Sequence, residues 1–131
     1  LEQIRSIATR QDVGVLVRAT TKDNIEIQGY VRAKLKLVSD EATILRAVKA
    51  LVHPDRQIEK ELEALLKFSF RETIAEYDLA DLQSNSLVME WKTGRAVLGK
   101  PLTAFGVQWE GTVAISDIHA YFGEKNQKSV L

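Results

Sequence analysis

The feature that most constrains the fold is a strict alternation of residue types between Ile25 and Leu37. Every second position holds an apolar residue or glycine, and the positions between them are polar, charged or tyrosine. The first set is Ile25, Ile27, Gly29, Val31, Ala33, Leu35 and Leu37, and the second is Glu26, Gln28, Tyr30, Arg32, Lys34 and Lys36. A period of two predicts a β-strand with one face on a core and the other facing water or a partner.

The residues just before this alternation predict a second strand and a tight turn. Segment 13–21 is rich in β-branched side chains, which favour extended structure. Lys22, Asp23 and Asn24 follow, and Asp and Asn bond their own backbone and tolerate left-handed φ angles. Strands 13–21 and 25–37 are therefore expected to form an antiparallel hairpin.

Two helices are expected next. Asp40 and Glu41 suit the positive end of a helix over 42–52. His53 ends that helix because the residue before a proline is pushed out of the α region, and Pro54 suits the first turn of another. This second helix, ending near Tyr77, carries an apolar stripe at steps of three and four: Ile58, Leu62, Leu65, Leu66, Ser69 or Phe70, and Ile74.

The remainder of the chain predicts two short helical segments and one long strand. Asp78 can cap a turn of helix over 79–83, and a helix is expected over 86–98. Its apolar line is Leu87, Trp91, Ala96 or Arg95, and Leu98. Gly99 and Pro101 should break this helix. A strand over 106–118 follows, with Gly111 as the expected site of a bulge.

The order of elements predicts an α+β fold, a small antiparallel-rich sheet with helices packed on one face. The sheet combines the N-terminal hairpin with the C-terminal strand, and Leu62, Leu66 and Ile74 should face Ile27, Val31 and Leu35. We divide the chain into a lead-in segment 1–12, a single domain 13–122 and a flexible tail 123–131. Since it begins at Leu1, with its only methionine at Met89, we expect a fragment of a longer protein.

Charge and cysteine content narrow the function. Lys plus Arg and Asp plus Glu both number 18, so the formal net charge is zero. Nucleic-acid binders that neutralise phosphates usually show a basic bias, so no nucleic acid is expected as a partner. The chain has no cysteine and therefore no thiolate metal site. It also lacks an apolar run long enough to span a bilayer, and a signal-peptide pattern.

The residue patterns give no support for catalysis. His53 and His119 lack the spacing of metal ligands, and no nucleophile elbow, Walker loop or dinucleotide fingerprint is present. We therefore expect no enzyme activity, no metal, no cofactor and no small-molecule substrate. Trp91 and Trp109 are expected to pack in the core or to be half-buried.

Two charged groups are candidates for an interaction face. Arg32, Lys34 and Lys36 project from the same side of one strand. Such a row is usually a solvated guard against edge pairing, but it could also meet anionic lipid headgroups. Arg71 and Glu72 lie on the second helix, where they form either an exposed polar patch or a charge contact between subunits.

Several short patterns occur in an order that resembles the SPFH (stomatin/prohibitin/flotillin, or band-seven) domain family. They are Thr21-Lys22-Asp23 before the alternating strand, Arg71-Glu72-x-Ile74, Asp78-Leu79-x-x-Leu82, Phe105-Gly106-Val107 and Ile115-Ser116-Asp117-Ile118. The resemblance covers about residues 13 to 118.

The resemblance implies a non-catalytic scaffold domain of a membrane-associated protein. In that family the domain follows a membrane anchor, precedes a coiled coil and packs laterally into homo-oligomers that organise membrane proteins and lipids. The resemblance implies that Arg71 and Glu72 form a charge contact between subunits. The alternative is a small α+β ligand- or RNA-binding domain, whose surface would be Tyr30 and the row Arg32, Lys34 and Lys36.

Overall fold

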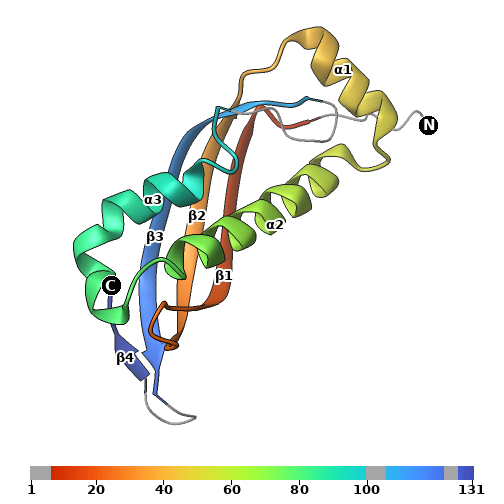
Figure 1. The fold of residues 1–131 in the computed structure, drawn as a ribbon. Coiled ribbons are helices and arrows are strands. Elements are labelled where there is room, and N and C mark those ends of the chain that lie inside the picture. The colour runs from red at the N-terminus through yellow and green to blue at the C-terminus, as the bar shows by residue number, and fades with distance from the viewer. Residues whose placement is uncertain (1–6, 100–105, 123–126) are drawn as a thin grey trace.

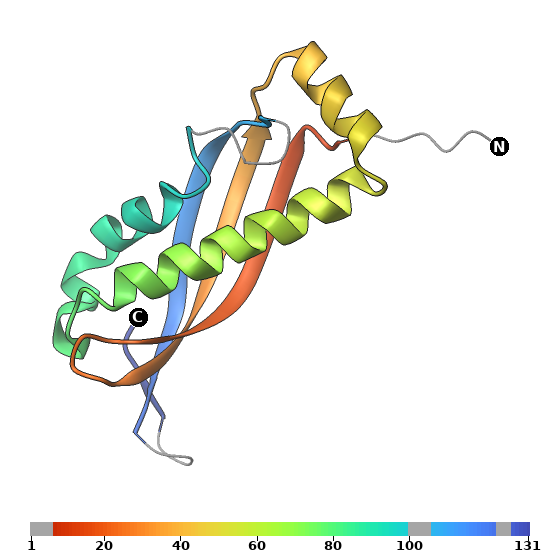
Figure 2. The ribbon, with the colours of Figure 1, turned by 45° about the vertical axis from the view of Figure 1, so that its right-hand side comes forward.

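The computed structural model describes residues 7–99, 106–122 and 127–131. Its elements run β1 (Arg10–Thr20), β2 (Glu26–Leu37), α1 (Glu41–Ala50), α2 (Pro54–Ile74), the 3-10 turns Leu79–Asp81 and Gln83–Asn85, α3 (Ser86–Gly94), β3 (Trp109–Tyr121) and β4 (Gln127–Ser129). The strands form one antiparallel sheet in the order β1-β2-β3-β4. Helices α2 and α3 lie across one face of it (Figure 1; Figure 2). The predicted α+β fold is confirmed.

The predicted hairpin is present, with β1 starting three residues earlier than expected, at Arg10. The register of β1 on β2 is continuous from Arg10, opposite Lys36, to Thr20, opposite Glu26. Asn24 occupies the turn with a positive φ of 62°, a conformation that asparagine adopts more readily than most residues. The turn chemistry read from the sequence therefore sets the pairing of the two strands.

Helices α1 and α2 begin as predicted, whereas Asp78, the predicted cap of the turn over 79–83, makes no side-chain capping hydrogen bond. The Asp40 side chain accepts a hydrogen bond of 2.7 Å from the Thr43 amide, which caps α1. Pro54 opens α2, which ends at Ile74 and not near Tyr77 as expected. The predicted stripe of α2 packs on the sheet, with Ile58, Leu62, Leu66, Phe70 and Ile74 all buried.

The core lies between this stripe and the alternating residues of β2. Ile27, Val31, Ala33 and Leu35 are buried, as the alternation predicts. Gly29 belongs to the same set and lies under the Phe70 ring: a Cβ at that position would be 2.7 Å from Phe70 Cζ. The glycine in the pattern thus makes room for the largest buried side chain of α2.

The predicted bulge lies elsewhere in β3. Gly111 pairs regularly with Leu35, and the register shifts between Gln28 and Tyr30, opposite Asp117. Asp117 has a positive φ of 52°, and the extra residue places both Ile115 and Ile118 in the core. Gly111 is needed for another reason, because a Cβ there would clash with the carbonyl oxygen of Lys34.

The expected flexible tail over 123–131 includes a strand. β4 pairs with the end of β3, His119 opposite Ser129, and the Val130 amide donates a 2.7 Å hydrogen bond to the carbonyl of Ile118. The Ile118 amide in turn donates to the Leu131 carbonyl at 2.8 Å. The polar composition concealed this pairing, because strand addition at an edge is made by backbone groups and needs few apolar side chains.

The helix expected over 86–98 ends at Gly94 and turns a different face to the core. Met89, Thr93 and Val97 are buried, whereas Leu87 is 79% exposed and Trp91 is 63% exposed. Trp109, by contrast, is fully buried, as expected. The apolar line drawn through Leu87 and Trp91 is therefore wrong, since both of these residues face outward, and so is the expectation that Trp91 is at least half-buried. Phe105, the first residue of the predicted motif Phe105-Gly106-Val107, lies outside the described residues.

Candidate interaction surfaces

The five residues proposed as one interaction face fall on two sides of the molecule. Arg32, Lys34 and Lys36 occupy the exposed positions of β2 on the sheet face that carries no helix. Arg71 and Glu72 belong to α2, which lies on the opposite face. The separation follows from the predicted packing of α2 on the side of Ile27, Val31 and Leu35, because alternate residues of a strand point to opposite faces of the sheet.

On the open face, Arg32 is already committed to a partner in the neighbouring strand. Its Nε and Nη2 atoms donate to the two carboxylate oxygens of Asp12 at 2.8 and 2.6 Å. These hydrogen bonds hold the pKa of Asp12 below its ordinary value and raise the pKa of the Arg32 guanidinium. A two-point contact of this kind fixes both side chains against the sheet.

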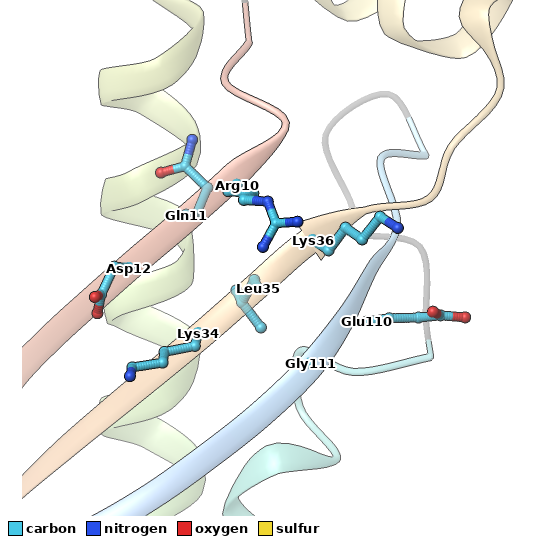
Figure 3. Close-up of a pocket in the computed structure, with 8 residues that line it drawn as sticks. All are labelled: Arg10, Gln11, Asp12, Lys34, Leu35, Lys36, Glu110 and Gly111. Carbon is cyan, nitrogen blue, oxygen red and sulfur yellow. The ribbon is translucent and has the colours of Figure 1, made fainter.

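Lys34 and Lys36 lie next along β2 and border a hollow of about 460 Å³. Figure 3 shows both lysines and Arg10 projecting from β1 and β2 around this hollow, with Glu110 on β3 at its far side. Within the described residues neither lysine forms an ion pair. Since Arg32 neutralises Asp12, the charges that remain around the hollow are those of Arg10, Lys34 and Lys36 and of the Glu110 carboxylate, a net charge of +2.

Tyr30 lies at the centre of the same open face. A Cβ at Gly14 on β1 would collide with the Tyr30 hydroxyl, so the ring extends across the strand above this glycine. Leu16, the residue directly opposite Tyr30 in the register, is 61% exposed. The open face therefore combines a half-buried aromatic ring and an exposed leucine with the basic end described above.

Arg71 lies at the outer edge of β1. Its Nε donates a 3.0 Å hydrogen bond to the backbone carbonyl of Arg18, so the side chain links the C-terminal part of α2 to this edge. Glu72 is exposed. These two residues are adjacent in sequence, yet only Arg71 reaches the sheet.

The motif residues of the hairpin turn meet those of the helix end. The Lys22 amide donates to the Tyr77 carbonyl at 2.8 Å, and the Leu79 amide donates to the Asp23 carboxylate at 3.1 Å. Thr21 Oγ1 also donates to that carboxylate, and its hydrogen bond is the main cause of the lowered pKa of Asp23. The Asp23 carboxylate thus links the hairpin turn to the segment after α2. This is a structural role for the patterns Thr21-Lys22-Asp23 and Asp78-Leu79-x-x-Leu82.

The exposed side of α3 forms a further apolar patch, made of Leu87, Val88 and Trp91. Leu87 and Val88 precede Trp91 by four and three residues, so all three share one flank of the helix. The Arg95 guanidinium lies 4.5 Å from the centre of the Trp91 ring. Sequence reasoning missed this patch because it assigned Leu87 and Trp91 to the buried side.

The described residues include no cluster of three His, Asp or Glu side chains that could hold a metal ion. Among the helices in the described ranges, none has the length and apolar character required to cross a membrane. No known protein family matches the chain. No curated protein is significantly similar to it either. Membership of the SPFH family therefore stays a prediction.

Proposed function

We propose that this domain is a non-catalytic assembly module of a membrane-associated protein, and that its open sheet face lies against anionic lipid headgroups. The observation that carries the proposal is the one-sided covering of the sheet. Helices bury one face, whereas the other presents Arg10, Lys34 and Lys36 around a hollow. A surface of this kind can contact a planar partner without any change in the fold.

The size of the expected attraction fits a domain that acts together with others. A basic residue near an anionic membrane contributes about 1 kcal/mol, so the three basic residues, opposed by the Glu110 carboxylate, provide about 2 kcal/mol. That corresponds to weak, salt-sensitive binding by one isolated copy. Several tethered copies would bind far more strongly, because linkage raises the effective concentration of each additional contact. The proposal therefore includes self-association of the full-length protein.

Vesicle co-sedimentation tests this assignment. We expect the chain to sediment with phosphatidylserine-containing vesicles at low salt and much less with phosphatidylcholine alone. Lys34→Glu with Lys36→Glu should abolish the difference. The matched control is Lys49→Glu with Lys60→Glu, which makes the same charge change on exposed helix positions. Loss of binding in both pairs would indicate a net-charge effect and would contradict a specific face.

The alternative of an RNA-binding domain rests on Tyr30 beside the basic row, since aromatic rings on a sheet can stack with bases. It predicts a different outcome in a parallel titration with single-stranded RNA. Micromolar affinity with a steep salt dependence, lost on Tyr30→Ala, would favour this alternative over the lipid assignment.

A further inference from the structure

We infer that the free edge of β1 pairs with β1 of a second copy of this chain, antiparallel and centred on Val15. The inference rests on the proposed function, since it supplies the contact through which the assembly module would associate. It is carried by the direction of the backbone groups of β1, by the charges along the strand and by the neighbouring flank of α2.

The hydrogen bonds of the hairpin determine which backbone groups of β1 face outward. The Thr21 amide donates to Ile25 and the Leu37 amide donates to Thr9, at 2.9 and 2.7 Å. Since the register is continuous between these pairs, the odd-numbered residues of β1 bond to β2 and the even-numbered residues point away. The contact from Arg71 to the Arg18 carbonyl agrees with this assignment.

This edge is open over its centre. From the part of the chain that the structure describes, no group bonds to the outward backbone of Asp12, Gly14 or Leu16. The strand is 11 residues long and has no proline or bulge. Long, flat edges without such protection readily accept another strand.

The other side of the sheet is guarded. The Glu90 carboxylate accepts a 2.8 Å hydrogen bond from the outward amide of Ile115 on β3, and the Gly99 amide donates to the Trp109 carbonyl. β4 covers the end of β3 at His119–Tyr121. The contrast identifies β1 as the edge available for pairing.

Charge selects one register for antiparallel pairing of two copies. A twofold axis at Val15 sets Asp12 of each copy opposite Arg18 of the other, and sets Gly14 opposite Leu16. Asp12 already bonds Arg32 and Arg18 already bonds Glu26 within each copy, so the new contact would join these two exposed ion pairs across the axis. A shift of the axis to Gly14 would place Arg10 against Arg18, two like charges that destabilise a cross-strand pair. A shift to Leu16 would leave Arg18, which pairs with Glu26 of its own copy at 3.3 Å, opposite Gly14 and with no charge partner in the other copy.

The same register gives the exposed Leu16 a partner. Gly14 has no side chain of its own, and the Tyr30 ring lies above it. Leu16 of a second copy would therefore pack on that ring, and the twofold axis repeats the same contact in the other direction. Leu16 is 61% exposed in the single chain, so this contact removes an apolar side chain from water.

The flank of α2 is complementary in the same arrangement. α2 crosses obliquely over β1 (Figure 2), and contacts it at both ends, because Asp55 near its start bonds to Gln11 and Arg71 near its end bonds to Arg18. Val15 is thus level with the middle of α2. Glu63 and Lys67 lie one turn apart there, on the flank that carries Arg71. The twofold axis would face Glu63 of one copy toward Lys67 of the other.

The arrangement also suits a flat membrane. A twofold axis at an edge, perpendicular to the sheet, keeps the open faces of both copies on the same side. The basic groups Arg10, Lys34 and Lys36 of the two copies would then meet one surface together. Tethering to that surface would raise the local concentration and strengthen an edge contact that is weak in solution.

Disulfide cross-linking tests the register, since the chain has no cysteine of its own. In antiparallel strands a pair without mutual hydrogen bonds has Cα atoms about 4.5 Å apart, within the disulfide range of about 4.4–6.8 Å. Val15→Cys at the axis should therefore form covalent dimers under mild oxidation, at high protein concentration and on phosphatidylserine vesicles. Thr20→Cys, exposed on the same strand but far from the axis, should give only the background of random collisions.

Two results would overturn the inference: cross-linking of Val15→Cys no faster than that of Thr20→Cys, or faster cross-linking of Leu16→Cys than of Val15→Cys. A non-covalent test is sedimentation equilibrium of Leu16→Lys, which should weaken dimerisation at least tenfold, whereas Val88→Lys on α3 should leave it unchanged. The lipid assignment can fail separately. Dimers of Val15→Cys in solution without vesicle binding would preserve the edge contact and contradict the membrane role.

Discussion

The two faces of β2 use alternate residues of one strand for different purposes. On the helix-covered face Ile27, Val31 and Ala33 are fully buried, whereas on the open face Lys34 and Lys36 are exposed. Apolar burial contributes about 25 cal/mol per Å², and an exposed ion pair usually contributes about 0–1 kcal/mol. The fold is therefore stabilised mainly by one face, which leaves the composition of the other free to serve an interaction.

The largest difference in stability between substitutions on the two faces is expected at Leu66. This residue is fully buried between α2 and the sheet, so Leu66→Ala should destabilise the chain by about 2–5 kcal/mol. The measurement is the denaturant midpoint with its slope, and Thr20→Ala, at an exposed position on the open face of β1, is the control. A loss below about 0.5 kcal/mol would mean that the α2 stripe does not form the core.

An intermediate effect is expected at Gly29, where the covered face has no spare volume. The Cβ of Gly29→Ala would lie 2.7 Å from Phe70 Cζ, so the substitution should cost about 1–3 kcal/mol through overpacking. Phe70→Leu alone should also destabilise the chain, but it should relieve part of the cost of Gly29→Ala. A double-mutant cycle by chemical denaturation measures this coupling, and strict additivity would show that the ring does not lie on the glycine.

The smallest effect concerns the Asp12–Arg32 pair on the open face. Because its hydrogen bonds lower the pKa of Asp12 from 3.8, the pair stabilises the fold above that pH, and this contribution is lost as the pH falls through the lowered value. Arg32→Gln should return the pKa of Asp12, measured by NMR titration, toward 3.8. The stability difference between wild type and variant should be small at pH 7 and should vanish below the wild-type pKa. A difference that grows with acid would contradict the assignment.

Regular local patterns determined much of the architecture. The period of two from Ile25 to Leu37 predicted β2 and its buried face, and the stripe of α2 predicted Leu62, Leu66 and Ile74 in the core. Both patterns are local because the geometry of a strand or helix repeats within a few residues. The order of these elements was also sufficient to predict helices on one face of an antiparallel sheet.

Only the tertiary structure decided the features that depend on contacts between distant segments. It turned Trp91 outward, shifted the bulge from Gly111 to Asp117 and added β4 to the sheet. It also left β1 as an open edge. In each case the segment that packs on or pairs with the residue lies far along the chain. The neighbouring residues in sequence therefore do not indicate which segment that will be.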